Sequence, residues 1–281
     1  PHVNMLRCTI ATFAAASGGA DAITALPFDH AAGLPTAFSR RIARNIQTIT
    51  AEESHVGRVQ DPAGGSWFVE SLTDELAQAA WVTLGEIEAA GGMAAALASG
   101  DIEGRIDTVN AARAKKLATR AIELTGVSTF PLAGEKAYQA KPRPEAPTYG
   151  GLKQIRDAEV FEALRDRAWA HEASTGEAPD VLLACLGAQR DFGARQGFAS
   201  NVLLVGGINA TQTHGGTPEE IAAKASEQGQ KVAVLASSAK IYADQAVAVA
   251  QALREAGVER VYLAGQLKEA GDVPDGLFDG T

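Results

Sequence analysis

The second half of the chain carries the pattern that most restricts its fold: short apolar runs that alternate with helix-like segments. Four runs have the length of a strand, at residues 181–186, 202–205, 232–236 and 259–264. Continuously apolar strands separated by helices are typical of a parallel sheet with helices on both faces. In such sheets ligands bind at the carboxyl ends of the strands, so the loop after each run is where we expect a site.

Helix signals fill the spaces between these runs. Residues 157–172 and 240–256 have helical patterns, and the sequence Thr217-Pro218-Glu219-Glu220 predicts a helix start. It combines a Thr cap, a Pro in the first turn and a Glu three residues after the cap. The fold class expected for this half is therefore a doubly wound α/β domain.

The first part of the chain is predicted to be mostly helical. Residues 4–17 predict a helix that stops at Gly18-Gly19, and an apolar stripe after Pro35 predicts a second one. Residues 22–26 are short and apolar between Asp21 and Pro27, which favours a buried strand.

A turn cluster at residues 61–66 precedes a longer helix that ends at Gly91-Gly92. Its apolar residues fall on one face: Val69, Leu72, Leu76, Ala80, Leu84 and Ile87. Further helices are expected over 93–98 and 105–124, and Trp67, Trp81 and Trp169 are expected to anchor the core.

Residues 131–150 contain four prolines and end at Gly150-Gly151, which predicts an extended linker. We therefore expect a first domain over 1–130, a linker over 131–156 and a second domain over 157–281. The chain begins without Met and ends close to a strand-like stretch, so we expect an excerpt of a longer protein.

Composition excludes several classes of protein. The chain has 25 Lys and Arg and 34 Asp and Glu, which gives a net charge of −9. The basic residues form no stripe that would bind nucleic acid or an anionic membrane. No run reaches the ~18 apolar residues of a membrane span. Cys8 and Cys185 lack a CxxC partner, so we expect neither a disulfide nor a cysteine zinc site, but thiols in the reducing cytoplasm.

Two loops invite a functional interpretation and also have an ordinary one. Residues 187–193 could bind a nucleotide phosphate, but their glycines do not fit G-x-G-x-x-G, and a strand-to-helix turn explains them equally. Residues 206–216 could form a lid or offer His214 as a ligand, or could be a solvated loop. No G-x-S-x-G nucleophile elbow is present. The residues alone identify no activity.

Residues 4 to about 125 resemble the mutase-barrel end of the methylmalonyl-CoA mutase family. The resemblance rests on Asn4-Met5-Leu6-Arg7, Gly18-Gly19 with Leu34-Pro35-Thr36, Arg41-Ile42-Ala43-Arg44-Asn45, Asp61-Pro62-Ala63-Gly64-Gly65-Ser66 and Ile87-Glu88-Ala89-Ala90-Gly91-Gly92-Met93. It continues more weakly across the linker. It implies the C-terminal part of a TIM-type (β/α)8 barrel followed by a flavodoxin-like cobalamin-binding domain, and an isomerase that uses adenosylcobalamin.

The cobalamin loops depart from the family's pattern. Catalytic members have D-x-H-x-x-G in the first loop, with a His that ligates cobalt, and the matching residues here include Ala188, Arg190 and Gly193. A guanidinium has no lone pair for a metal. The family's S-x-L falls at Ser237-Ser238-Ala239, and its G-G at Ala264-Gly265. We therefore expect no cofactor-binding, metal-binding or catalytic residue, and regard Ala188, Arg190, Gly193, Ser237 and Gly265 as remnants of a degenerate site.

The barrel departs too, because Asp21 and Thr24 stand where catalytic members have Gln and His. The pattern resembles that of a non-catalytic small subunit, which implies a large catalytic partner that binds the cofactor. Three alternatives remain open: an active mutase of another acyl-CoA, such as isobutyryl-CoA, with His214 on cobalt; a flavodoxin-like binding or regulatory module; and a homodimeric scaffold.

Overall fold

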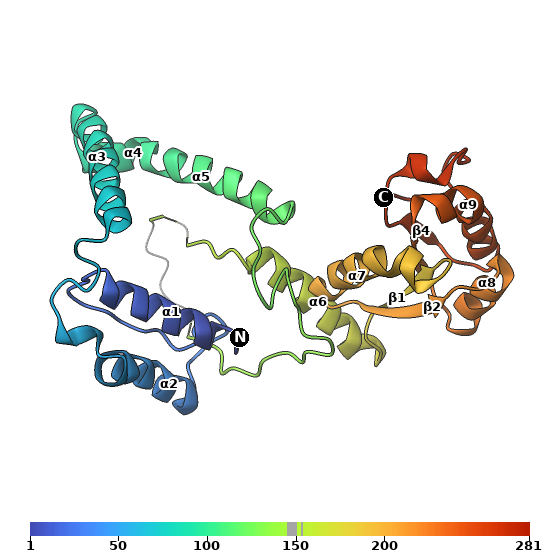
Figure 1. Ribbon diagram of the computed structural model, residues 1–281, viewed down its shortest axis with the longest axis horizontal. Coiled ribbons are helices and arrows are strands. Elements are labelled where there is room, and N and C mark those ends of the chain that lie inside the picture. Colours follow the sequence, from blue (N-terminus) through green and yellow to red (C-terminus); the bar gives the residue numbers. More distant parts are fainter. Residues whose placement is uncertain (145–150, 153) are drawn as a thin grey trace. The chain divides into compact units, whose positions relative to one another are not determined.

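The structure is a computed structural model that describes residues 1–144, 151–152 and 154–281. It divides into two compact units, one of Pro1–Thr119 with Tyr138–Gln154 and one of Arg120–Ala137 with Ile155–Thr281 (Figure 1). Residues 145–150 and 153 of the predicted linker, including Pro147 and Gly150, lie outside the described residues.

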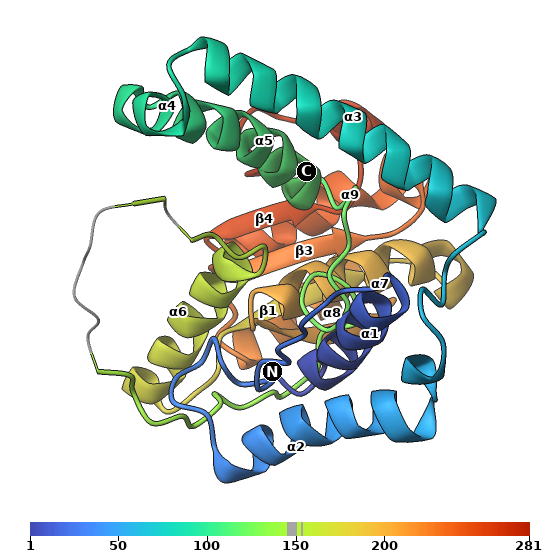
Figure 2. The ribbon, with the colours of Figure 1, turned by 90° about the vertical axis from the view of Figure 1, so that its left-hand side faces the viewer.

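The second unit contains a four-stranded parallel sheet with the order β2-β1-β3-β4. The strands are β1 (Asp180–Cys185), β2 (Asn209–His214), β3 (Val232–Ala236) and β4 (Arg260–Leu263). Leu183 of β1 lies opposite Gln212 of β2 and Val234 of β3. Figure 2 shows β3 and β4 side by side, in the register that pairs Val232 with Arg260. The predicted parallel sheet is confirmed.

Helices cover both faces of this sheet. Because successive strand residues point to opposite faces, Leu183 and Cys185 pack with Phe192 of α7 (Gln189–Val205), whereas Leu182 and Ala184 face the opposite layer. That layer consists of α8 (Pro218–Glu227) and α9 (Ala239–Glu255). α6 (Glu159–Thr175) packs beside α7, and a short 3-10 helix, η3 (Leu267–Ala270), packs against α9.

One predicted strand is wrong. Residues 202–205 form the last turn of α7, and the second strand is the polar segment 209–214, of which only Thr213 is buried. β2 lies at one edge of the described sheet, where side chains are partly exposed to solvent and can be polar. The predicted loop over residues 206–216 is therefore mostly a strand, and His214 is its last residue.

The first unit has a small core around two helices. α1 (Asn4–Ser17) packs against α2 (Ala37–Thr48), and α2 buries Ala43 and Ile46. Both helices lie where the sequence predicts them. A five-residue π-helix, η1 (Ile49–Glu53), and a 3-10 turn, η2 (Val56–Arg58), follow. The remaining helices are α3 (Trp67–Ala89), α4 (Met93–Ser99) and α5 (Asp101–Ala118).

Three expectations for the first unit are wrong. Residues 22–26 form no strand, because this segment has no ladder partner among the described residues, and Leu26 is exposed. The predicted apolar face of α3 is largely exposed, with only Ile87 buried. Trp67 and Trp81 are 92% and 75% exposed, so they are not core anchors. Trp169 is half-buried and donates to the carbonyl of Glu135 at 3.2 Å.

Part of the predicted linker is bound to the first unit. The hydroxyl of Tyr138 donates to Asp29 at 3.0 Å, and the amide of Leu34 donates to the carbonyl of Lys141 at 2.8 Å. Arg143 donates to the carbonyls of His30 and Gly33. These contacts fix residues 138–143 as an extended strap.

No helix among the described residues is long and apolar enough to cross a membrane.

Candidate functional site

The order of the strands reverses between β1 and β3, and the carboxyl ends of these two strands lie side by side at one edge of the sheet. The chain passes from β1 outward to β2, and then returns to β3 on the other side of β1. In sheets of this kind the crevice between the two diverging loops is the usual ligand site. Here those loops follow β1 and β3, and they hold the remnant positions Ala188 and Ser237.

The loop after β1 turns directly into a helix. Gly187 has a φ of 81°, a conformation that favours glycine, and α7 begins two residues later at Gln189. The carboxylate of Asp191 accepts from the amide of Ala188 at 3.0 Å, which satisfies a donor at the helix start. Arg190 is exposed in this first turn, and Gly193 lies one turn further along α7. The predicted turn is confirmed by this geometry.

The loop after β3 is tied to the loop after β1. Ser237 is fully buried, and its hydroxyl donates to the carbonyl of Leu186 at 2.7 Å. The amide of Leu186 in turn donates to the carbonyl of Ala236 at 3.0 Å. The hydroxyl of Ser237 therefore donates to the protein's own backbone.

Tyr242 of α9 joins a third loop to these two. Its side chain is fully buried, and its hydroxyl accepts from the amide of Ser237 at 2.9 Å. The same hydroxyl lies within hydrogen-bonding distance of the carbonyls of Leu235, at 2.9 Å, and Ala264, at 3.0 Å. Burial raises the pKa of Tyr242, so the phenol stays protonated and can donate.

An ion pair lies next to Gly265, in the loop after β4. Arg195 of α7 contacts Glu269 of η3, with Nη1 and Oε2 2.6 Å apart, and its guanidinium lies 5.1 Å from the ring centre of Tyr242. The hydrogen bond from Arg195 lowers the pKa of Glu269. A Cβ atom on Gly265 would come within 2.6 Å of Arg195 and 2.7 Å of Glu269, so a larger residue here would require the ends of these two side chains to move.

Sequence reasoning missed Arg195, Tyr242 and Glu269. A signal for Arg195 was present, because it stands three residues after Phe192 and four before Ala199, two buried residues of α7. A charged residue in that row of a helix faces inward and needs a partner. No comparable signal marked Glu269, which comes from a short turn after the last strand.

The remaining candidates do not join this cluster. His214 ends β2, with its ring 6.1 Å from that of Phe192. Cys185 is fully buried, and burial raises its pKa to about 11, so its thiol is inert near neutral pH. Asp21 and Thr24 lie exposed in the irregular segment before Pro27 in the first unit. Among the described residues, no three His, Cys, Asp or Glu side chains gather as a metal site would require.

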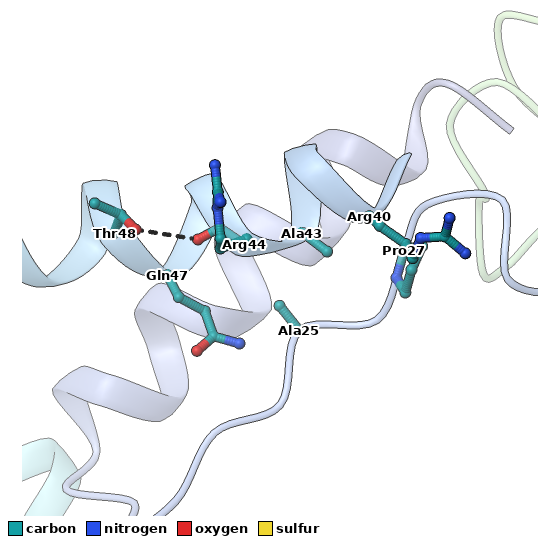
Figure 3. Close-up of a pocket in the computed structure, with 7 residues that line it drawn as sticks. All are labelled: Ala25, Pro27, Arg40, Ala43, Arg44, Gln47 and Thr48. Atoms are coloured by element: carbon teal, nitrogen blue, oxygen red, sulfur yellow. Dashed lines mark hydrogen bonds between the residues drawn. The ribbon is translucent and has the colours of Figure 1, made fainter. Parts of the chain in front are cut away.

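An open pocket of about 410 Å³ lies between Ala25, Pro27 and one side of α2. Arg40, Ala43, Arg44, Gln47 and Thr48 complete its lining. In Figure 3 Arg40 extends alongside Pro27, whereas the guanidinium of Arg44 points away from the Ala25 segment. The two guanidinium groups therefore do not converge on one point of the pocket.

The second unit is thus a parallel α/β domain of the class that binds ligands at the carboxyl edge of its sheet. A family model described as methylmalonyl-CoA mutase matches residues 1–175. This chain belongs to the methylmalonyl-CoA mutase family.

Individual relatives agree with this assignment. The chain is 50% identical over 273 residues to the methylmalonyl-CoA mutase small subunit of Propionibacterium freudenreichii subsp. shermanii, covering 97% of this chain and 42% of that protein. It is 51% identical over 281 residues to the small subunit of Streptomyces virginiae, covering 100% and 45%. It is 37% identical over 185 residues to the mitochondrial mutase of Bos taurus, covering 66% and 24%. The chain spans less than half the length of these relatives.

Proposed function

We propose that this chain is part of the non-catalytic small subunit of a heterodimeric, adenosylcobalamin-dependent methylmalonyl-CoA mutase. Relatives that carry the small-subunit name are 50% and 51% identical to this chain over nearly its whole length. The complex would interconvert methylmalonyl-CoA and succinyl-CoA, with cofactor and substrate held by a large partner subunit. This subunit would contribute an interface and stability.

The observation that carries the proposal is the loop after β1. The residues here do not fit a cobalt-ligating site, because Arg190 is a permanent cation without a lone pair. Ala188 has no carboxylate with which to orient an imidazole. Asp191 is near, but its carboxylate accepts from the start of α7. No chemical step is therefore assigned to a corrinoid on this chain.

The first unit supports the same conclusion. Asp21 and Thr24 stand where catalytic members carry a Gln and a His, and a carboxylate at residue 21 would repel an anionic acyl-CoA. We therefore assign no catalytic residue to this chain.

Fold details favour the two-domain architecture of the family. The order β2-β1-β3-β4 is that of the first four strands of a flavodoxin-like sheet. Gly280 pairs in parallel with Tyr262 of β4, where a fifth strand of that order would lie. We infer a flavodoxin-like domain over 157–281, a linker over 131–156, and over 1–130 the end of a TIM-type barrel with its outer helices.

Partners and location follow from the same features. The acidic charge without a basic stripe favours a protein partner over nucleic acid or an anionic membrane. Cys8 and Cys185 are free thiols, which fits a reducing cytoplasm.

The test is to purify the full chain alone and titrate it with adenosylcobalamin. We expect no binding in the micromolar range, and co-purification with a second, larger chain when the two are produced together. Micromolar binding with the spectrum of histidine-ligated cobalt would refute the proposal. A homodimer that recruits no partner would also refute it.

The active-mutase alternative needs His214 as a cobalt ligand. Replacing His214→Ala in the assembled complex tests it, and we expect activity to remain. A nucleotide-binding module would instead gain thermal stability with nucleotides, which we do not expect because residues 187–193 lack a phosphate-binding glycine pattern.

A further inference from the structure

The lost cobalt ligand is not the one feature that disfavours a ligand at the carboxyl edge of the sheet, because side chains of the protein also occupy this edge. A macrocyclic ligand at this edge would cover the loops of three neighbouring strands, a width of roughly 10 Å. The three loops concerned follow β1, β3 and β4, and the hydroxyls of Ser237 and Tyr242 bond them to one another. These two hydroxyls therefore already have hydrogen-bond partners within the protein.

One side chain crosses this edge between the helical layers. Arg195 belongs to α7, on one face of the sheet, yet its guanidinium lies over Tyr242 of α9, on the other. Its partner Glu269 comes from η3, beyond β4. The Arg195 and Glu269 side chains are only 29% and 20% exposed. We call this pair the clasp.

The clasp fills the space above the last loop. Gly265 offers no side chain, and the space that a Cβ would take is within 2.7 Å of both members of the clasp. A ligand that approached the backbone at Gly265 would therefore meet Arg195 and Glu269 first. An ion pair with both partners largely desolvated holds its geometry better than one in open solvent.

We propose that the Arg195–Glu269 clasp is a second barrier to a cobalamin-sized ligand, one that acts through space and separately from the lost cobalt ligand. This inference rests on the proposed function, and it predicts that a restored imidazole alone does not restore a site.

The experiment compares variants of the full chain by titration with adenosylcobalamin, followed by absorbance. A donor variant carries Ala188→Asp and Arg190→His, and an opened variant adds Arg195→Ala and Glu269→Ala. A matched control adds Lys231→Ala and Glu259→Ala to the donor variant instead. That pair is 3.4 Å apart and exposed, away from the carboxyl edge. Circular dichroism checks folding, and Arg195→Ala alone on the donor variant replaces the opened variant if the latter does not fold.

We expect the opened variant to bind at least about tenfold more tightly than both the donor variant and the control. Equal affinity of the opened and donor variants, including failure of both to bind, would overturn the clasp. An equal gain in the control would overturn it as well. Binding by the unaltered chain with histidine-ligated cobalt would instead refute the proposed function, so the two failures can be told apart.

Discussion

Asp29 is a buried carboxylate in a small core, and hydrogen bonds to one of its two oxygens offset part of the cost of burying its charge, whereas Oδ1 is buried without a hydrogen-bond partner. Only 1% of the residue is exposed, and Oδ2 accepts from the amide and hydroxyl of Thr36, both at 3.3 Å, and from Tyr138 at 3.0 Å. Burial alone would raise the pKa of Asp29, but the hydrogen bonds from Ser39, Thr36 and Tyr138 outweigh it and lower the pKa. The bond to Tyr138 also holds the strap.

The lowered pKa predicts a pH-dependent contribution to stability. The ionised carboxylate stabilises the fold fully above the unfolded pKa of about 3.9, and this contribution is lost as the pH falls through the lower folded pKa. We expect Asp29→Asn to reduce the free energy of unfolding by about 1–3 kcal/mol at neutral pH and by less in acid. Thermal unfolding of the variant and the unaltered chain, at neutral pH and at a pH below the folded pKa of Asp29, measures the two losses. The exposed Asp21→Asn is the control, and an equal loss at both pH values would contradict the prediction.

At the scale of elements, α8 shows how local sequence can set a helix start. The hydroxyl of Thr217 accepts from the amide of Glu220 at 3.3 Å, and the carboxylate of Glu220 accepts from the amide of Thr217 at 2.8 Å. The reciprocal bonds satisfy two donors that a helix start leaves open. This element was predicted correctly because all its determinants lie within four residues.

We expect Thr217→Ala to lower stability by about 1 kcal/mol, because the amide of Glu220 loses its acceptor. Thr217→Ser keeps the hydroxyl and should change stability by much less. Urea unfolding of the two variants measures the difference, and similar losses for both would show that the hydroxyl plays no capping role.

The end of α7 depends instead on a residue far away in the sequence. Arg165 of α6 donates through Nε to the carbonyl of Val205 at 3.2 Å and through Nη2 to that of Leu204 at 3.4 Å, and it pairs with Glu135. A cation at a helix carboxyl end also interacts favourably with the helix dipole. Its side chain is only 10% exposed, so its partners would be left poorly solvated without it.

Arg165→Ala should therefore reduce the free energy of unfolding by about 2–3 kcal/mol. Arg165→Lys should recover part of this, because one ammonium cannot reach all three acceptors. The exposed Arg167→Ala on the same helix is the control and should change stability by less than about 0.5 kcal/mol. Denaturant unfolding measures all three, and a small loss for Arg165→Ala would contradict the assigned role.

The contrast between these helices explains which elements could be predicted. Largely buried strands such as β1 and β3 can be recognised in the sequence, because helices cover both of their faces and their residues are therefore apolar. The edge strand β2 does not, because NATQTH has no apolar run and only its pairing with β1 makes it a strand. Residues 202–205 were wrongly predicted as a strand because an apolar helix end has the composition of a short strand.

The candidate site divides in the same way. Ala188, Arg190, Ser237 and Gly265 could be located from the sequence because each aligns with a short motif of the family that the chain resembles. The clasp could not be found in full, since the contact between Arg195 and Glu269 joins α7 to a turn after β4 and depends on tertiary packing. The departure of Ala188 and Arg190 from the family's pattern was therefore visible in the sequence, whereas the contact between Arg195 and Glu269 was not.

At the scale of the whole molecule, the first unit exposes an unusual amount of apolar surface. On α3 alone Trp67, Phe68, Leu76 and Trp81 are 62–92% exposed. α1 adds Leu6, Ile10 and Phe13, each about half exposed or more. Large exposed apolar side chains gathered on one element favour binding to other surfaces or aggregation.

We therefore expect the 281-residue chain to bind a hydrophobic dye such as anilinonaphthalene sulfonate in its folded state, and to self-associate as its concentration rises. Trp67→Ser with Phe68→Ser removes the most exposed aromatic pair of α3 and should lower both dye fluorescence and the average mass in solution. Phe130→Ser is the matched control, because Phe130 is 79% exposed but belongs to the second unit. If the control reduces dye binding as much as the α3 variant does, the apolar surface of α3 is not the part of the molecule that drives association.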